Sequence, residues 1–427
     1  MELLIFVVSL FCLLAFGIPI AIVLALCAII LMLFMGQWDP LTISQSMVMG
    51  TNNFPLMAIP FFMLAGEIMA QGGLSERIVK LANLVVGRIK GGLGYAAILA
   101  SILFAGLSGS AVADAAALGS ILVPLMQSSG YKVERAAGFI CAGSIIAPII
   151  PPSIPMIVLG TTVSISITRL FMAGIVPGLM LGIALMIVWK FIVKIDGYTD
   201  VVTFSREEAK QIVKDSLPAL FMPVLIVGGI RLGIFTPTEA GAFAVVYALI
   251  VCTLVYKELN LSKIVDICIN SAKSTSLVMF IVASASAVGW FITIAQIPNQ
   301  VASLLGGLID KPVALLLVIN VFLFLIGMVM DLTPNILIFA PVLFPVIIQA
   351  GIDPYFFALV MILNLCIGLV TPPVGTVLYV GCSVAKISFA KLVKGILPFI
   401  IVELVILLIC IIFPQLVIVP VKFIMGS

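Results

Sequence analysis

Apolar residues fill most of the chain in long runs, separated by short clusters of Gly, Pro, Ser or Thr. A membrane-spanning helix needs about 20 apolar residues. On this criterion we expect apolar helical segments near residues 3–34, 54–71, 94–107, 133–149, 154–194, 217–256, 268–296, 313–330, 355–370 and 374–418. Several of these are too long or too short for one crossing. Because the short ones end at Gly, Pro, Ser or Thr, the pattern predicts broken helices and re-entrant hairpins.

Two polar stretches interrupt the apolar pattern. Residues 196–216 (DGYTDVVTFSREEAKQIVKDS) predict a connector outside the membrane. Residues 72–94 carry four basic residues against one acidic residue, Glu76, so the positive-inside rule predicts a cytoplasmic loop. The first apolar run lacks a basic leading segment and continues past residues 17–19, so we interpret it as mature membrane structure. Residues 17–19 either kink one helix or turn between two.

An internal repeat appears when the chain is compared with itself at an offset of 221 residues. Many of the identical pairs are Gly or Pro. These residues interrupt regular backbone structure instead of filling apolar surface, so chance is a poor explanation for them. They are Gly106/Gly327, Pro124/Pro345, Gly130/Gly351, Pro151/Pro372, Pro152/Pro373, Gly160/Gly381, Gly174/Gly395 and Pro177/Pro398. We therefore expect one integral membrane domain over residues 1–427, with repeat 1 near 1–195, the connector at 196–216 and repeat 2 near 217–420.

Polar side chains also correspond between the two repeats. Ser110 aligns with Asp331 and Asp114 aligns with Asn335, at two expected hairpins near residues 105–130 and 327–350. About 40 residues later, each repeat has a paired-proline break. Paired prolines remove amide donors and free carbonyl groups upstream, and unwound backbone at membrane depth is tolerated where protein buries it or where it lines a cavity.

This layout predicts binding chemistry. Hydroxyl, carboxylate and carbonyl oxygens that converge on one point suit a hard monovalent cation such as sodium, and half-helix N-termini offer positive dipole ends to an anionic substrate. Two such constellations would form two ion sites around a shared substrate cavity. The alternative is that the serines bond back onto helix carbonyls and that Gly and Pro permit close packing.

Composition narrows the function classes. The chain is 63% hydrophobic and 9% charged, with a mean hydropathy of +1.37, which indicates a polytopic helical membrane protein. It contains no histidine, which excludes His-dependent metal sites, Ser-His-Asp hydrolysis and His proton relays. The eight cysteines lie in apolar stretches without a CxxC motif, and no dense cluster of Lys and Arg suggests nucleic acid. We therefore do not expect an enzyme.

Ionisable residues inside apolar stretches are candidates for function, because each costs roughly 2.5–3.5 kcal/mol at a helix centre. They are Glu67, Asp114, Arg169, Arg231, Glu239 and Asp331. Asp331 ranks first because it occupies the position of Ser110, and Asp114 ranks second. For Glu239 we favour a structural role in the first turn of a helix that starts near Pro237. Arg169 either contacts an anionic substrate or extends to the interface, and Glu67 is either a subunit contact or a charge near a loop.

The chain resembles the large membrane subunit of tripartite ATP-independent periplasmic (TRAP) transporters. The stretches GIFTPTEAGAFA, SGSAVADAAALGS, PPS and TPPVGT carry the resemblance, which spans approximately residues 3–418. It is most similar to the permease subunit for sialic acid (N-acetylneuraminate), and C4-dicarboxylate members share the same motifs. The resemblance implies sodium-driven uptake across the bacterial inner membrane, with no cofactor besides the coupling ion. It also implies a separate four-helix small membrane subunit and a periplasmic binding protein as partners.

The resemblance further implies a fold and a set of site residues. The implied fold is an inverted repeat with two re-entrant hairpins and two broken helices, moving as an elevator. The implied sodium ligands are Ser108, Ser110, Gly143, Ala147, Pro148, Gly327, Asp331, Gly368, Thr371 and Val374. The implied substrate contacts are Ser110, Asp114, Ser153, Asp331, Asn335 and Thr376. The implied structural breaks are Pro151, Pro152, Pro372 and Pro373.

The orientation of the second repeat and the function each have alternatives. The residues alone do not fix the inversion, because we count five or six crossings between the hairpins and only an odd number inverts the second copy. The function also has alternatives. They are import of C4-dicarboxylates by the same class of transporter and a membrane channel or structural subunit.

Overall fold

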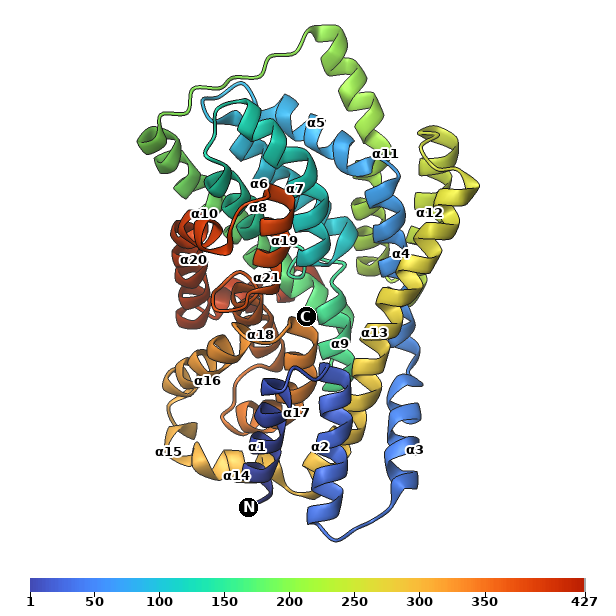
Figure 1. The fold of residues 1–427 in the computed structure, drawn as a ribbon, viewed down its shortest axis with the longest axis vertical. Helices are drawn as coiled ribbons and strands as arrows, with labels where there is room; N and C mark the ends of the chain where they lie inside the picture. The colour runs from blue at the N-terminus through green and yellow to red at the C-terminus, as the bar shows by residue number, and fades with distance from the viewer. Residues whose placement is uncertain (426–427) are drawn as a thin grey trace.

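The computed structural model describes residues 1–425, and this part of the chain folds into helices joined by turns and loops, with no strand. Eight of its helices are long and apolar enough to cross a bilayer. The predicted all-helical polytopic fold is therefore confirmed (Figure 1). The helices divide into two groups, which we call the scaffold and the bundle.

The scaffold is organised around one long helix, α13. This helix runs along much of the molecule (Figure 1) and packs against α2, α3 and α4, while α12 packs against α4. The scaffold helices are α1 (Glu2–Ala15), α2 (Ile20–Phe34), α3 (Pro40–Thr51), α4 (Ala58–Gln71), α11 (Arg206–Arg231), α12 (Pro237–Ile250) and α13 (Leu261–Ile294). A 3₁₀ turn (Phe54–Met57) precedes α4, and a π turn (Val251–Val255) follows α12.

The bundle holds the two hairpins and the two broken helices. Its helices from the first repeat are α6 (Gly92–Ser108), α7 (Ala111–Ser128), α8 (Val133–Ser144), α9 (Ile154–Thr162) and α10 (Ile167–Asp196). Those from the second repeat are α16 (Pro312–Gly327), α17 (Leu332–Gln349), α18 (Pro354–Gly368), α19 (Thr376–Ala385) and α20 (Phe389–Ile412). The two repeats interlock, because α8 packs against α20 and α7 packs against α19.

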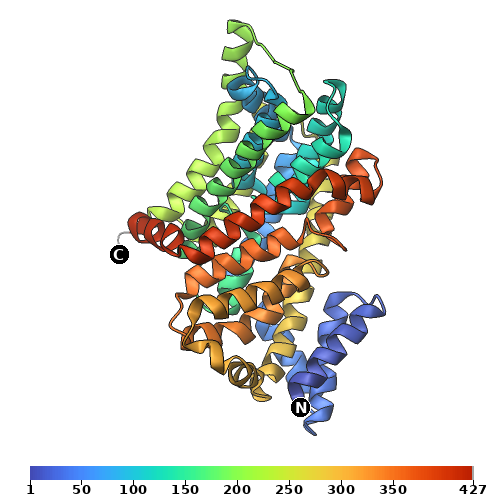
Figure 2. The same cartoon turned by 90° about the vertical axis from the view of Figure 1, so that its left-hand side faces the viewer.

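Short helices join the two groups. The connecting helices are α5 (Leu74–Val86), α14 (Ile297–Leu304) and α15 (Gly306–Ile309). The last helix, α21 (Gln415–Met425), packs against α10. Figure 2 shows α1 and α2 side by side at one edge of the molecule, and it shows α20 crossing the bundle obliquely. The connecting helices therefore attach the hairpins to the scaffold at two places.

The repeat is reproduced in three dimensions. Adding 221 to the bounds of α7, residues 111–128, gives residues 332–349, which are the bounds of α17. The N-cap positions of these helices are Ser110 and Asp331, the pair matched by the sequence. The hairpin α6–α7 lies in one half of the molecule and α16–α17 in the other (Figure 1). Between them the chain passes through α8–α9, α10, α11, α12 and α13, and this odd number of passes fits an inverted second copy.

Several segment boundaries differ from the sequence prediction. Residues 17–19 turn between two helices, with Gly17 in the left-handed region at φ 73°. The connector ends at residue 205, because Ser205 and Glu208 form a capping box that starts α11 inside the predicted loop. Most of the predicted basic loop 72–94 is the amphipathic helix α5. Each hairpin also includes its first arm, α6 or α16, of which the predicted hairpin ranges contained only the end.

The connector folds onto the base of the first hairpin. The Tyr131 hydroxyl donates a hydrogen bond to Asp200, the Leu93 amide donates to the same carboxylate, and the Val202 amide donates to the Gly87 carbonyl at 2.8 Å. Burial raises the pKa of the Tyr131 phenol, and the neighbouring Asp200 carboxylate raises it further. Burial raises the pKa of the Tyr198 phenol to about 12. Both phenols therefore stay neutral and able to donate at physiological pH.

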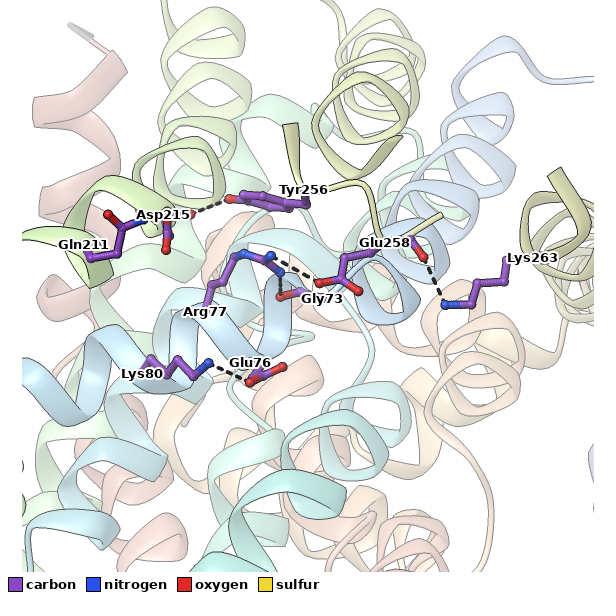
Figure 3. A network of polar contacts seen from close by, with 9 residues as sticks. All are labelled: Gly73, Glu76, Arg77, Lys80, Gln211, Asp215, Tyr256, Glu258 and Lys263. Atoms are coloured by element: carbon purple, nitrogen blue, oxygen red, sulfur yellow. Dashed lines mark hydrogen bonds and ion pairs between the residues drawn. The ribbon is translucent and has the colours of Figure 1, made fainter. Parts of the chain in front are cut away.

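A polar network around Arg77 fastens α5 to the scaffold (Figure 3). The Arg77 guanidinium donates to the Gly73 carbonyl at 2.8 Å and to the Glu258 carboxylate at 3.3 Å, and it lies 3.8 Å from the centroid of the Tyr256 ring. The Tyr256 hydroxyl donates to the Asp215 carbonyl of α11 at 2.7 Å. The arm α5 is thus tied both to α11 and to the segment before α13.

We expect Arg77→Ala to lower stability by about 2 kcal/mol, because it removes a charge-assisted hydrogen bond and a cation–π contact of a mostly buried side chain. Lys80→Ala is the matched control, since Lys80 makes an exposed i,i+4 ion pair with Glu76 at 2.7 Å. Such pairs contribute roughly 0.3–0.5 kcal/mol. Thermal unfolding in detergent measures both variants. Equal unfolding temperatures for the two variants would show that the network does not fasten the arm.

Candidate functional site

A cavity of about 350 Å³ lies where the two hairpin tips meet the scaffold. The first tip contributes Ser108, Gly109 and Ser110, and the second contributes Asp331, Leu332 and Thr333. On the scaffold side, α4 and α13 close the cavity with Met63, Gly66, Glu67, Ala70, Ser271, Ser274 and Val278. The cavity therefore joins both repeats and both groups of helices.

The first hairpin tip is a two-residue turn built for a reversal of direction. Gly109 has φ 62°, in the left-handed region that Gly adopts readily. Its open side faces the first break, since a Cβ atom there would lie 2.5 Å from the Pro152 carbonyl oxygen. Ser110 caps α7 by accepting a hydrogen bond from the Ala113 amide at 3.4 Å. The tip is thus packed directly against the broken helix α8–α9.

The second hairpin tip is packed against the second break in the same manner. The Met328 carbonyl accepts hydrogen bonds from the Val374 amide at 3.2 Å and from the Gly375 amide at 3.3 Å. The Thr376 hydroxyl donates to the Asp331 carboxylate at 3.3 Å. Asp331 stands at the N-cap of α17, but its side chain makes no capping hydrogen bond there. Its carboxylate is therefore free to face the cavity.

Both breaks contain the predicted paired prolines, and both Pro–Pro peptide bonds, Pro151–Pro152 and Pro372–Pro373, are cis. The Ser153 hydroxyl donates to the Pro148 carbonyl at 2.5 Å and accepts from the Met156 amide at 3.2 Å, so it closes the first break and caps α9. The Thr371 hydroxyl donates to the Ile367 carbonyl at 2.7 Å in the second break. The first unwound segment is therefore covered by protein, as backbone at membrane depth requires, whereas Pro373 in the second segment is exposed.

Two buried oxygens behind the tips lack hydrogen-bond donors, and the repeat relates them to each other. Asp114 accepts a hydrogen bond from the Ser108 hydroxyl through one oxygen, while its second oxygen has no partner within residues 1–425. Asn335 donates to the Met330 carbonyl at 3.1 Å, and its own oxygen likewise has no partner in the described chain. Both side chains are fully buried. An unpaired buried oxygen is costly, so each position suits a donor or a cation.

The electrostatics of the cavity combine two opposing features. Its lining within the described residues includes two carboxylates, Glu67 and Asp331, and no lysine or arginine. Three helices also begin at its wall, namely α7 at residue 111, α9 at residue 154 and α17 at residue 332. Helix N-termini carry partial positive charge and unsatisfied amides. The cavity therefore offers carboxylates for cations beside helix ends for an anion.

The structure brings together only part of the predicted site. Ser108, Ser110, Pro148 and Asp331 line the cavity, and Thr376 contacts Asp331. Ser153, Asp114 and Asn335 are fully buried behind the cavity wall. The remaining predicted ligands belong to the breaks, the hairpin end or the adjoining helices and lie outside the cavity lining; they are Gly143, Ala147, Gly327, Gly368, Thr371 and Val374.

Three other predicted ionisable residues lie outside the cavity lining. Glu239 forms a capping box with Thr236, which confirms its structural role in the first turn of α12. Arg169 is exposed and lies over the Tyr355 ring at 5.9 Å, beside a separate small pocket. Arg231 ends α11 and is exposed. The idea that Arg169 contacts a substrate in the main cavity therefore does not fit this arrangement.

The scaffold side of the cavity was not predicted from the sequence. Glu67 was a candidate without a site, and here its carboxylate lines the cavity and accepts a hydrogen bond from the Gln71 amide group at 2.6 Å. Its position inside an apolar run is the signal that could have placed it. Ser271 and Ser274 of α13 gave no such signal, because the repeat does not relate them to either hairpin.

Comparisons with known proteins agree on one family. Residues 7–416 match the family described as "Tripartite ATP-independent periplasmic transporter, DctM component". The chain is 48% identical over 410 residues to the 2,3-diketo-L-gulonate TRAP transporter large permease protein YiaN of Escherichia coli, covering 96% of each chain. It is 38% identical to the sialic acid TRAP transporter large permease protein SiaM of Vibrio cholerae, covering 93% of each chain.

A solved structure shares the fold at much lower identity. The YdaH transporter of Alcanivorax borkumensis is 16% identical and superimposes with a TM-score of 0.61, over 88% of this chain and 87% of that one. The prediction of a transport protein rather than an enzyme is confirmed by the family match. The eight apolar helices and the family together confirm a multi-pass protein of the bacterial inner membrane.

Proposed function

This chain belongs to the DctM family of TRAP transporter large permeases, and we propose that it imports an organic acid anion together with sodium ions through the cavity between its hairpin tips. One observation carries the proposal. A single cavity joins both hairpin tips, two carboxylates and three helix N-termini, with no basic side chain among its described lining residues.

The paired orphan oxygens support two cation sites. Asp114 and Asn335 occupy equivalent positions in the two repeats, and each holds a buried oxygen that lacks a donor in the part of the chain described. Sodium is a hard cation that prefers hydroxyl, carbonyl and carboxylate oxygens, and a cation near each tip would satisfy these atoms. The nearby oxygens are those of Ser108 and Ser110 at the first tip and those of Asp331 and Thr376 at the second.

Charge explains why the ion and the substrate would be coupled. Glu67 and Asp331 face the same cavity, so an anion entering it alone meets like charge. Sodium bound at the tips neutralises this charge, after which the N-termini of α7, α9 and α17 can hold a carboxylate. The anion therefore binds more tightly when sodium is present, and by linkage sodium binds more tightly when the anion is present.

The contacts of α13 support an elevator movement. Ser271, Ser274 and Val278 of this helix face the main cavity. Farther along, Val282, Ala285, Ser286 and Gly289 face a second cavity of about 390 Å³, whose other walls come from α3, α9 and α17. The side chains of α13 that face the cavities between residues 271 and 289 are Ser, Val, Ala and Gly, and Trp290 follows them; the small ones leave room for the bundle to slide. Such a displacement would carry the tips from one cavity toward the other.

Large permeases of this family work with a small membrane subunit and a periplasmic binding protein. We propose that a binding protein delivers the substrate here and that the small subunit is a separate chain. Two relatives of this chain are named for the substrates sialic acid and 2,3-diketo-L-gulonate, and both compounds are sugar-derived carboxylates. A carboxylate on a polyhydroxylated chain fits helix amides beside serine hydroxyls, and sialic acid remains our first candidate.

Uptake by proteoliposomes tests the function. The permease, its small subunit and its binding protein are reconstituted, and labelled sialic acid is supplied with an inward sodium gradient. We expect accumulation that falls to background when potassium replaces sodium, because potassium does not match sites formed for the smaller ion. Unchanged uptake in potassium would refute the sodium coupling.

The same preparation separates the alternatives. Labelled 2,3-diketo-L-gulonate and labelled C4-dicarboxylates are supplied in parallel assays, each with its own binding protein, and the anion that accumulates to the highest level identifies the substrate class. A channel predicts ionic conductance across a planar bilayer and no accumulation against a gradient. Conductance without accumulation would therefore replace the transporter proposal.

A further inference from the structure

A carboxylic acid outside the cavity lining lies in the interior of the bundle. Glu403 is in α20 and is fully buried. Neither of its carboxyl oxygens has a hydrogen-bond partner in residues 1–425. The neighbouring turns of α20 place Phe399, Ile400, Ile406 and Leu407 around it, and all four are buried. The surroundings along its own helix are therefore apolar.

The nearest charged groups on α20 and on the helices packed against it are remote from Glu403. Lys394 lies nine residues before Glu403 on α20, which is about 13 Å along the helix axis. Arg135 of α8 donates to the Gly395 carbonyl at 2.9 Å, and this anchors it about two turns away from Glu403. Glu134 adjoins Arg135 in the first turn of α8, the charged residues of α10 are in its first turn and its last two turns, and α16, α18 and α19 contain none. No cation thus stands beside this carboxyl group in the described chain.

The packing of α20 connects Glu403 to the second break. Helix α20 packs against α8 and α18, which carry the buried thiols Cys141 and Cys366. Helix α18 ends at Gly368, whose Cα lies against the backbone of Gly327 at the end of the first arm of the second hairpin. Glu403 therefore lies on a helix packed against the one that leads into the second break.

The repeat shows that this carboxyl group is not part of the duplicated framework. Subtracting 221 from 403 gives Gly182 of α10. A Cβ atom at Gly182 would lie 2.5 Å from Cδ1 of Ile102, so an acid there would require the Ile102 side chain to move. The second repeat alone holds a carboxyl group at this level. Packing alone therefore does not explain why the second repeat has an acid at this position.

We propose that Glu403 is a proton-binding site, occupied at neutral pH, that competes with cation binding at the Asp331 tip. An ionised carboxylate without donor or counter-ion in an apolar interior is far costlier than the neutral acid. The neutral acid is thus the form that this packing accommodates. Release of the proton to water leaves a negative charge behind the tip, which attracts a cation there. Bound cation and bound proton then disfavour each other by the same factor.

The proton site is tested by infrared difference spectroscopy of the reconstituted wild-type complex and its Glu403→Gln variant. Gln keeps the size of the side chain and removes the ionisable group. We expect the wild type to show the carbonyl band of a protonated carboxylic acid that the variant lacks. If the difference spectrum shows the bands of an ionised carboxylate instead, the proton site is overturned. Because the substitution could disturb folding, the same band is also followed in the wild type during alkaline titration, where it must decline.

The competition with cations rests on the proposed sodium coupling and is measured separately. The sodium concentration for half-maximal thermal stabilisation is determined in mildly acidic and mildly alkaline buffer. We expect the sodium concentration that half-stabilises the wild type to be at least about fivefold lower at the alkaline pH, within the usual range of such couplings. We expect the variant to lose most of this change. Equal pH responses of the two proteins would overturn the competition. Absence of any sodium effect would reject the sodium coupling as well, while the infrared result would still decide the proton site.

Discussion

Replacing Asp331 by Asn is expected to abolish sodium-dependent uptake while leaving the protein folded. Asn keeps the size of the side chain and an oxygen that can accept from the Thr376 hydroxyl, so the tip stays in contact with the second break. The change removes one negative charge from the cavity wall. A charge pair at 4 Å contributes about 4 kcal/mol at an effective dielectric constant near 20. Loss of this energy corresponds to roughly a thousandfold weaker sodium binding.

Uptake of labelled substrate at saturating binding protein measures this effect. Asp310→Asn is the matched control, because Asp310 is an exposed carboxylate in the turn before α16 and does not line the cavity. Co-purification with the small subunit and an unchanged unfolding temperature establish that the Asp331→Asn protein is folded. Uptake by this variant at the wild-type rate, with the wild-type sodium dependence, would remove Asp331 from the site.

Replacing Gly368 by Ala is expected to destabilise the second hairpin and to reduce uptake severely. Gly368 and Gly327 bring the end of α18 and the end of α16 into backbone contact, and a Cβ atom at Gly368 would lie 2.5 Å from the Gly327 carbonyl carbon. The obstacle is backbone on both sides, so no flexible side chain can move aside. Overpacking of this kind typically costs about 1–3 kcal/mol. The separation would also displace the amides of Val374 and Gly375 from the Met328 carbonyl.

Gly228→Ala provides the comparison for this substitution. Gly228 lies inside α11, and a Cβ atom there would meet nothing within 4 Å. Gly228 is in the last turn of α11, so Ala at this open position is expected to stabilise by no more than the roughly 0.5–1 kcal/mol of a mid-helix site. Thermal unfolding and uptake are measured for both variants. If Gly368→Ala unfolds at the same temperature as Gly228→Ala and transports normally, the close packing of the second hairpin on its break is not needed for stability or transport.

The sequence alone located the hairpin tips and the breaks because these features depend on residues close together in the chain. Ser110 and Asp331 each begin a helix, and Gly106 and Gly327 precede them at fixed spacing. The paired prolines lack amide donors, so they interrupt a helix at any position where they occur. Each of these effects is local, and the 221-residue offset supplied an independent check on the positions.

The scaffold side of the cavity could not be derived in the same way. Ser271 and Ser274 are distant in sequence from both hairpins, and only the packing of α13 against α4 and α17 brings them to the tips. Ser153 was expected at the substrate, but its hydroxyl is used by the Pro148 carbonyl within the break. Glu403 carries the same signal as Glu67, a single acid inside a long apolar run, but the 221-residue offset pairs it with Gly182 and links it to neither hairpin tip.

The course of the chain through the connector has a consequence for how the polypeptide could be divided. Each repeat contributes helices to both the scaffold and the bundle, and the extended stretch at residues 197–205 is the covalent link between the halves. The contacts of α8 with α20 and of α13 with α2 would still join two separately synthesised fragments. Assembly of a working transporter from two half-length polypeptides therefore requires no new interface, only the recognition of surfaces that the intact chain already buries.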